Sequence, residues 1–220
     1  MPTPPVIILI RHGQSEHHVR GLSGGWTETP LTALGHEQSE RAAARLKAEL
    51  GEIPIRIFTS DLLRCQETAR HIAAAFGVEA VADARLREHN NGAAVDLTMT
   101  EVRQRFPGVF DSPWPLDFRP FPGSETGREL YERAGAFIDT LPDKGPLPVV
   151  VSHGGTLICL VARWLGLTPE ALEPIGFAFH TASITVLQTD RHGNRIVERL
   201  NDIAHVAGLD GWVGLGHSVR

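Results

Sequence analysis

Short apolar runs constrain the fold of this chain more than any other feature of its sequence. Residues 6–10 are all β-branched or aliphatic, and similar runs occupy residues 147–151 and residues 55–58, the latter with one charged residue, Arg56. A run of this length without polar alternation is typical of a strand that is buried on both faces of a parallel sheet. These three segments therefore predict central strands that helices cover on both sides.

Amphipathic segments with helical spacing separate the apolar runs. The two clearest are residues 32–50, which end before Gly51, and residues 61–76, which end before Gly77 and have Ser60 as the predicted N-cap. A buried helix is predicted at residues 155–165, after the third strand. Two later strands, residues 183–187 and 196–200, are predicted on either side of a turn at residues 191–194. This alternation predicts an α/β fold, a three-layer sandwich in which a mostly parallel central sheet of five or six strands is flanked by helices.

One segment, residues 90–127, interrupts the alternation. It is rich in proline and contains one short helical pattern at residues 98–106. Connections of this length are commonly either functional lids or disordered, and the aromatic residues here favour an ordered lid: Phe106, Phe110, Trp114, Phe118 and Phe121. A chain of 220 residues without an internal repeat or linker is expected to form a single domain, residues 1–220, that contains this lid insertion.

The charge balance and the apolar pattern exclude several functional classes. The chain has 21 basic and 26 acidic residues, a net charge of −5 and no basic cluster, so a nucleic-acid partner has little electrostatic support. No apolar run approaches the roughly 20 residues of a membrane helix, and the N-terminus lacks a basic leader. These features predict a cytoplasmic protein with no membrane partner. Cys65 and Cys159 lie in apolar helical patterns and are expected to be reduced core thiols.

Two of the predicted strands end in a histidine that is followed by glycine. Arg11 and His12 follow the first strand, and His153 follows the third. Ligands bind beyond the carboxyl ends of parallel strands, so both imidazoles are placed to react. A single His-Gly pair is more commonly structural, but its repetition at two strand ends favours a site. Because Arg11 and Arg64 add guanidinium groups suited to bidentate phosphate contacts, the four side chains predict a phosphoryl pocket.

Seven short motifs spread over most of the chain extend this pattern. They are residues 9–15, 25–35, 59–64, 86–88, 122–126, 151–155 and 201–205. In content and order these motifs resemble those of the histidine phosphatase superfamily, which includes cofactor-dependent phosphoglycerate mutases and fructose-2,6-bisphosphatases. A bare Arg-His-Gly would be weak support, whereas seven motifs in the same order are hard to attribute to chance.

The resemblance implies a role for each residue of the predicted pocket. His12 would be the nucleophile, which attacks phosphorus and becomes a phosphohistidine that water then hydrolyses. Arg11, Arg64 and His153 would surround the phosphoryl oxygens with positive charge and hydrogen-bond donors. Glu88 matches the family's acid and base, which protonates the leaving oxygen and then activates water.

Two positions and one segment depart from the family's pattern. His18 stands where the family commonly has an asparagine that touches phosphate; it could donate a hydrogen bond there, or it could be a solvated loop residue together with His17. Gly24 stands where the family often has a side-chain donor, and the neighbouring Ser23 could compensate. His18, Ser23 and Gly24 are therefore candidate substrate-binding residues. The segment after Glu88 also departs, so an altered substrate wall is expected.

Some of these residues have an alternative interpretation. Glu88 could form a surface ion pair with Arg85 or Arg87, but the catalytic role is favoured because the spacing to Gly92 fits the family. His205 belongs to a late motif that is interpreted as mainly structural rather than catalytic.

The remaining histidines and arginines raise two further questions. Eleven histidines could suggest a metal site, but their spacing matches no known ligand pattern, so neither a metal nor a cofactor is expected. Arg103, Arg105 and Arg119 could hold a second anionic group of a substrate, although an ordinary solvated helix face is favoured for the first two.

The sequence therefore predicts a phosphatase, a phosphoric monoester hydrolase that acts through a phosphohistidine. Its partner would be a small-molecule phosphate ester, with sugar phosphates and phospho-sugar acids as the leading classes. One alternative is a phosphotransferase of the cofactor-dependent phosphoglycerate mutase type, which is less favoured because the segment between Glu88 and His153 is shorter than a mutase insertion. Others are a catalytically silent binding module and a protein phosphatase. A homodimer is left open.

Overall fold

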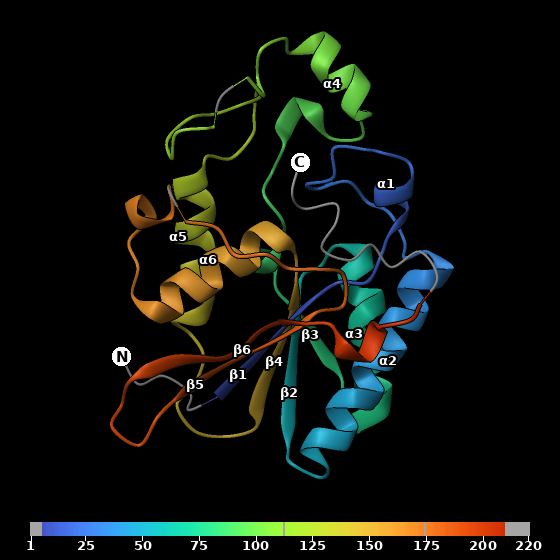
Figure 1. Cartoon of the computed structure of the whole chain (residues 1–220), viewed down its shortest axis with the longest axis vertical. Helices are drawn as coiled ribbons and strands as arrows, with labels where there is room; N and C mark the ends of the chain where they lie inside the picture. Colours follow the sequence, from blue (N-terminus) through green and yellow to red (C-terminus); the bar gives the residue numbers. More distant parts are fainter. Residues whose placement is uncertain (1–5, 112, 174, 210–220) are drawn as a thin grey trace.

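The computed structural model describes residues 6–111, 113–173 and 175–209. Within these ranges six strands form one sheet in the order β3-β2-β4-β1-β5-β6 (Figure 1). The first four strands of this order run parallel, whereas β5 runs antiparallel to both of its neighbours, β1 and β6. The strands are β1 (Val6–Arg11), β2 (Ile55–Thr59), β3 (Ala80–Ala82), β4 (Leu147–Ser152), β5 (Ile184–Thr189) and β6 (Arg195–Asp202). The prediction of a mostly parallel α/β sheet is confirmed.

Strand β1 lies inside the sheet, between β4 and β5. Residues Ile7 to Ile10 are at most 3% exposed, as the uninterrupted apolar run predicts. The parallel register with β4 pairs Arg11 with Ser152. Because both strands end there, the two residues that follow, His12 and His153, leave the sheet side by side.

In the part of the chain that the structure describes, four long helices cover the two faces of the sheet and make the three layers (Figure 1). One face packs against α2 (Ala33–Leu50) and α3 (Leu63–Phe76), and the other against α5 (Gly127–Ile138) and α6 (Gly154–Leu165). The shorter elements are α1 (Glu16–Val19), α4 (Met99–Arg105) and the 3₁₀ turns η1 (Ala84–Leu86), η2 (Gly92–Ala94), η3 (Pro169–Leu172) and η4 (Ala204–Val206).

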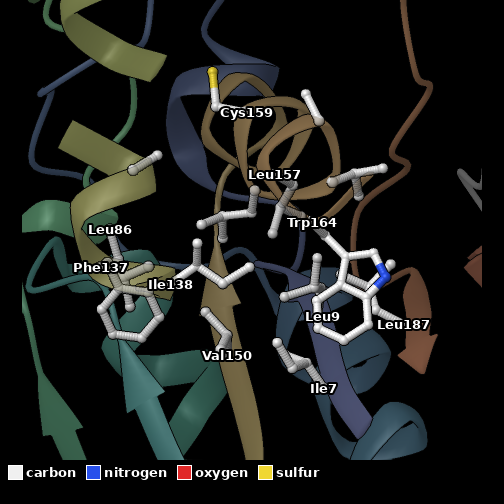
Figure 2. Close-up of a cluster of buried hydrophobic side chains, with 14 of the residues drawn as sticks. Ile7, Leu9, Leu86, Phe137, Ile138, Val150, Leu157, Cys159, Trp164 and Leu187 are labelled. Carbon is white, nitrogen blue, oxygen red and sulfur yellow. The ribbon is translucent and has the colours of Figure 1, made fainter. Parts of the chain in front are cut away.

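The core under α5 and α6 fixes the end of the sheet where the histidines lie. Figure 2 shows Ile7, Leu9 and Val150 of the sheet beneath Leu157 and Trp164 of α6. Each of these side chains is almost fully buried. The same helix begins directly after His153, so its packing also holds the backbone of the predicted site.

Some elements differ from the sequence-based predictions. Helix α3 begins at Leu63 with Leu62 as its N-cap, so the prediction that it starts at residue 61 after a Ser60 cap is wrong. The Ser60 hydroxyl instead accepts from the Leu62 N–H and lies 2.9 Å from His153 Nε2. Helix α5 and strand β3 were not predicted: β3 is only three residues long, and α5 starts at a glycine.

The proline-rich segment is ordered by its own small core. Helix α4 has a capping box between Thr98 and Glu101, and its Val102 packs with Phe121. Rings of the segment contact one another, with centroids 5.1 Å apart for Phe106–Phe121 and 5.8 Å for Phe110–Trp114 and for Trp114–Phe121. Four of the five predicted aromatics thus form a cluster.

Two other expectations concern a membrane-spanning helix and an N-terminal leader. No helix within the described ranges is long and apolar enough to cross a membrane. Residues 1–5, on which the expectation of a missing leader rests, and the C-terminal residues 210–220 lie outside those ranges.

A matched pair of leucine truncations tests this description of the core. Leu157 in α6 is 0% exposed, whereas Leu200 in β6 is 42% exposed. Leu157→Ala should lower the free energy of unfolding by about 2–5 kcal/mol, because it removes buried apolar contacts and leaves a cavity. Leu200→Ala should cost less than about 1 kcal/mol in the same urea titration. Equal losses in the two variants would contradict the packing described here.

Candidate active site

His12 lies at the base of a cavity at the carboxyl ends of β1 and β4, and His153 lies beneath it. Their ring centroids lie 5.0 Å apart, and both side chains are buried. The His12 backbone N–H donates to the Ser152 carbonyl at 3.0 Å, which continues the β1–β4 pairing past the last strand residue. The sequence prediction that the two strand ends bring these histidines together is therefore confirmed by their geometry.

The ring of His12 is oriented by its own loop. Its Nδ1 lies 2.7 Å from the Gly13 carbonyl oxygen, which can only accept, so Nδ1 carries the proton and Nε2 keeps its lone pair. Burial, reinforced by the positive charge of Arg64, lowers the pKa of His12 well below its ordinary value. The imidazole is therefore neutral near pH 7. Gly13 allows this arrangement, since a Cβ there would lie 2.4 Å from the Gly35 carbonyl oxygen.

Arg64, at the start of α3, is a buried cation held between the two histidines. Its Nε lies 3.3 Å from His12 Nε2 and 3.2 Å from His153 Nδ1. Its Nη1 and Nη2 each donate at 2.7 Å to a backbone carbonyl, those of Thr27 and Gly25. A guanidinium fixed in this way is a preorganised donor for an oxyanion beside the His12 ring.

Arg11 lies on the other side of the cavity. Its Nη1 donates to the Phe179 carbonyl at 2.6 Å, and its Nη2 lies 3.1 Å from His18 Nε2. Its Nε is buried and has no hydrogen-bond partner among the described residues. Buried donors are almost always satisfied, so this orphan donor marks a place where an anionic ligand would complete the hydrogen bonding.

His153 is neutral for the same reasons as His12. Its Nδ1 accepts from Arg64, which places its proton on Nε2, 2.9 Å from the Ser60 hydroxyl. Burial, followed by the charges of Arg64 and Arg11, lowers the pKa of His153 well below its ordinary value. The thiol of Cys65 lies 3.3 Å from the same Nε2, is fully buried and is not in a disulfide, as predicted for a core cysteine.

Glu88 reaches the cavity from the loop after η1 and is held by the N-terminus of α6. One carboxylate oxygen accepts from the backbone N–H of His89 at 2.9 Å and of Thr156 at 3.2 Å; the other accepts from Gly155 N–H at 3.1 Å. The alternative of a surface ion pair with the neighbouring arginines is wrong. Arg87 pairs with Asp61 at 2.7 Å and Arg85 with Asp83 at 2.6 Å.

The three candidate substrate-binding residues, His18, Ser23 and Gly24, all line the cavity, but they are not equivalent. The His18 ring stacks on His12 with centroids 5.5 Å apart, and burial with the charge of Arg11 lowers the pKa of His18 to about 3. The Ser23 hydroxyl donates to the Ala94 carbonyl, so it is engaged within the protein. Gly24 has a positive φ of 75°, and a Cβ there would lie 3.3 Å from the His17 ring.

The cavity has a volume of about 610 Å³. All the predicted site residues except His153 line it directly, and His153 lies beneath His12 and Arg64. Several lining residues were not predicted, because they come from α1 and the loop after it, and from the residues that follow Glu88. They are His17, Leu22, His89, Asn91, Met99, Phe110, Trp114 and Phe121.

Other candidate residues lie away from the cavity. Arg119 donates to the Ser124 carbonyl and pairs with Glu129, and Arg103 lies over the Phe110 ring, 5.1 Å from its centroid. His205 Nε2 lies 2.9 Å from the Ala182 carbonyl oxygen and does not line the cavity, so direct catalysis by His205 has no support. Within the described part of the chain no group of three acidic, histidine or cysteine side chains could hold a metal ion.

Comparison with known proteins decides the family. The sequence pattern of the histidine phosphatase superfamily (branch 1) matches residues 7–202. The chain belongs to this superfamily. One relative of this histidine phosphatase, the probable phosphoglycerate mutase GpmB of Shigella boydii serotype 18, is 37% identical over 212 residues, which cover 91% of this chain and 94% of the relative.

Solved structures of other proteins share the fold. Bacillus stearothermophilus YhfR superposes on this histidine phosphatase with a TM-score of 0.80 and 27% identity, over 91% of this chain and 98% of that chain. A mycobacterial glucosyl-3-phosphoglycerate phosphatase in complex with VO3 has a TM-score of 0.74 and 27% identity, over 90% and 98% of the two chains.

The neutral histidines of the site predict a stability loss in acid. An unfolded histidine titrates near pH 6.5, but His18 in the folded chain has a pKa of about 3, so below about pH 6.5 protonation favours the unfolded state. His18→Asn removes this contribution. Between pH 7.5 and pH 5, the free energy of unfolding should fall by about 1–2 kcal/mol less in His18→Asn than in wild type.

Urea titrations at the two pH values measure this difference. His192→Asn, which changes an exposed histidine of the β5–β6 turn, is the matched control and should behave like wild type. An identical acid loss in wild type and His18→Asn would contradict a neutral, buried His18.

Proposed function

We propose that this histidine phosphatase hydrolyses small phosphate monoesters through a covalent phosphohistidine on His12. The observation that carries the proposal is the state of the His12 ring: Nδ1 is engaged by the Gly13 carbonyl, and Nε2 is unprotonated beside the Arg64 guanidinium. A neutral imidazole with a directed lone pair, set among fixed cations, is the arrangement that attack on a phosphoryl group requires.

The first half-reaction transfers the phosphoryl group to the enzyme. His12 Nε2 forms a bond to phosphorus while the bond to the ester oxygen breaks, and Glu88 in its protonated form gives its proton to that oxygen as the alcohol leaves. Arg11 and Arg64 supply the donors and positive charge that stabilise the three equatorial oxygens, and His153, whose Nδ1 accepts from Arg64 Nε, positions the Arg64 guanidinium. The orphan Nε of Arg11 supports this assignment, because a phosphoryl oxygen would be its missing acceptor.

The second half-reaction regenerates the enzyme. Glu88, now a carboxylate, takes a proton from a water molecule as the water oxygen attacks phosphorus and the bond to His12 Nε2 breaks. Inorganic phosphate leaves, and both residues return to their starting states. The carboxylate is well placed to hold this position through both steps, because three backbone N–H groups fix it.

We favour hydrolysis over phosphoglycerate mutase chemistry, although a relative is named for the latter. A mutase must hold a second anionic group of a bisphosphorylated intermediate. Of the lining residues that the structure describes, only Arg11 and Arg64 are arginine or lysine, and both face the first phosphoryl position. We also infer that residues 90–127 act as a lid within a single domain, because side chains of this segment supply part of the cavity wall.

A panel of phosphate esters tests the proposal. Sugar phosphates and phospho-sugar acids, the classes the sequence favours, are included with a phosphopeptide, and 3-phosphoglycerate is assayed with and without 2,3-bisphosphoglycerate. Phosphate release without bisphosphoglycerate-stimulated isomerisation is expected. Isomerisation in place of release would establish the mutase alternative, and a folded protein with neither activity would establish a silent binding module.

Replacing the two reacting groups should separate their roles. His12→Asn should lower kcat by a factor of about 10³ or more, because the nucleophile is lost. Glu88→Gln should lower it by about 10²–10⁴ for alkyl esters, which need a proton on the leaving oxygen, and by less for a nitrophenyl ester, which does not. His192→Asn should be unaffected. Equal losses for both kinds of ester in Glu88→Gln would contradict its role as the acid.

Gly155 should be needed to position Glu88. A Cβ at Gly155 would lie 2.6 Å from a Glu88 carboxylate oxygen, so Gly155→Ala must displace the carboxylate. We expect kcat to fall by about tenfold or more with little change in the urea midpoint. Gly176→Ala is the control, because a Cβ there meets no atom within 4 Å and its φ is not positive. An unchanged kcat in Gly155→Ala would contradict the positioning by α6.

A further inference from the structure

Three aromatic side chains of the proline-rich segment form one wall of the cavity. We call this group, Phe110, Trp114 and Phe121, the aromatic wall. Phe110 and Trp114 are stacked at 26° between ring planes, and Trp114 meets Phe121 edge to face at 89°. Phe110 and Trp114 remain 37% and 38% exposed. Large aromatic surface left open in a cavity is a ready platform for a second ring.

The aromatic wall adjoins the leaving-group side of the site. His89 follows Glu88 directly, lines the same cavity and has its ring centroid 6.5 Å from that of Trp114. Glu88 is the group proposed to protonate the leaving oxygen. The part of the substrate beyond that oxygen therefore extends toward the rings.

Polar groups near the aromatic wall are already engaged within the protein. The Trp114 indole N–H donates to the Val109 carbonyl at 2.6 Å. The Asn91 amide donates to the Ser23 carbonyl at 3.0 Å, and the Ser23 hydroxyl donates to Ala94. A leaving group rich in hydroxyls would lose hydration here and find few donors in exchange, which is costly.

The charged groups near the aromatic wall also favour an uncharged, apolar leaving group. Arg103, the arginine nearest to Phe110 by ring contact, lies over that ring and is absent from the cavity lining. A carboxylate or second phosphate on the leaving group would therefore meet apolar rings, the His89 imidazole and the carboxylate of Glu88, because the described lining has no arginine or lysine other than Arg11 and Arg64. Such a group is disfavoured by both desolvation and repulsion.

We propose that the enzyme prefers phosphate monoesters whose leaving group carries a flat, uncharged, apolar ring, which stacks on the aromatic wall while the phosphoryl group binds at His12. This inference rests on the proposed hydrolase function. Among the possible substrates, it favours phosphate esters whose leaving group carries an aromatic ring over phospho-sugar acids.

Four phosphate esters test this preference: benzyl phosphate, glycerol 3-phosphate, glucose 6-phosphate and 3-phosphoglycerate. All four release a primary alcohol, so the chemical step is similar and differences in rate report mainly on binding of the leaving group. The value of kcat/KM for benzyl phosphate should exceed that of each other ester by about tenfold or more. Trp114→Leu, which keeps apolar volume but removes the ring plane, should reduce this ratio by about fivefold. Phe118→Ala should leave it unchanged, since Phe118 lies in the same segment, is 43% exposed and does not line the cavity.

A binding measurement makes the result independent of turnover. By calorimetry, benzylphosphonate should bind wild type about tenfold more tightly than methylphosphonate, and Trp114→Leu should lose most of that difference. Equal kcat/KM for the four esters, a preference for 3-phosphoglycerate, or equal binding of the two phosphonates would overturn the inference. If benzylphosphonate binding depends on Trp114 but no ester is hydrolysed, the aromatic subsite stands and the hydrolase proposal fails.

Discussion

The parallel pairing of β1 with β4 is the interaction on which the rest of the site depends. The register that sets Arg11 opposite Ser152 makes both strands end at one level, and the backbone bond from His12 to Ser152 extends the pairing by one residue. Two imidazoles from distant parts of the sequence then lie 5.0 Å apart. A shift of one residue in this register would send one of the rings to the opposite face of the sheet.

Burial of cations supplies the electrostatic character of the site. Arg64 and Arg11 are anchored by backbone carbonyls, so their positions are set before any ligand binds. Their charges, added to burial, keep His12 and His153 neutral. The N-terminus of α6 holds Glu88 with backbone N–H groups at the other side of the cavity. The site thus combines a neutral imidazole, fixed positive charge and one carboxylate within one cavity, and a ligand anion would complete its hydrogen bonding.

The sequence was sufficient for the parts of this arrangement that depend on local pattern. Uninterrupted apolar runs predict parallel strands, and the residues at their ends, Arg11, His12 and His153, follow from that rule alone. Local sequence pattern did not predict the features that depend on tertiary contacts. Serine is a residue type favoured at N-caps, but Ser60 does not cap α3, and its hydroxyl instead lies 2.9 Å from His153 Nε2. The aromatic wall was also beyond prediction, because aromatic content shows that the proline-rich segment is ordered but not which rings face the cavity.

Isolation of the covalent intermediate tests the central claim most directly. A substrate-loaded sample quenched in alkali within the first turnover can be digested and mapped by mass spectrometry, with His12→Asn treated in parallel. The account predicts a phosphoryl group on His12 that is stable in alkali, is lost in acid and is missing from the variant. Turnover by wild type with no phosphoryl group on His12, or with one on another residue, would contradict it.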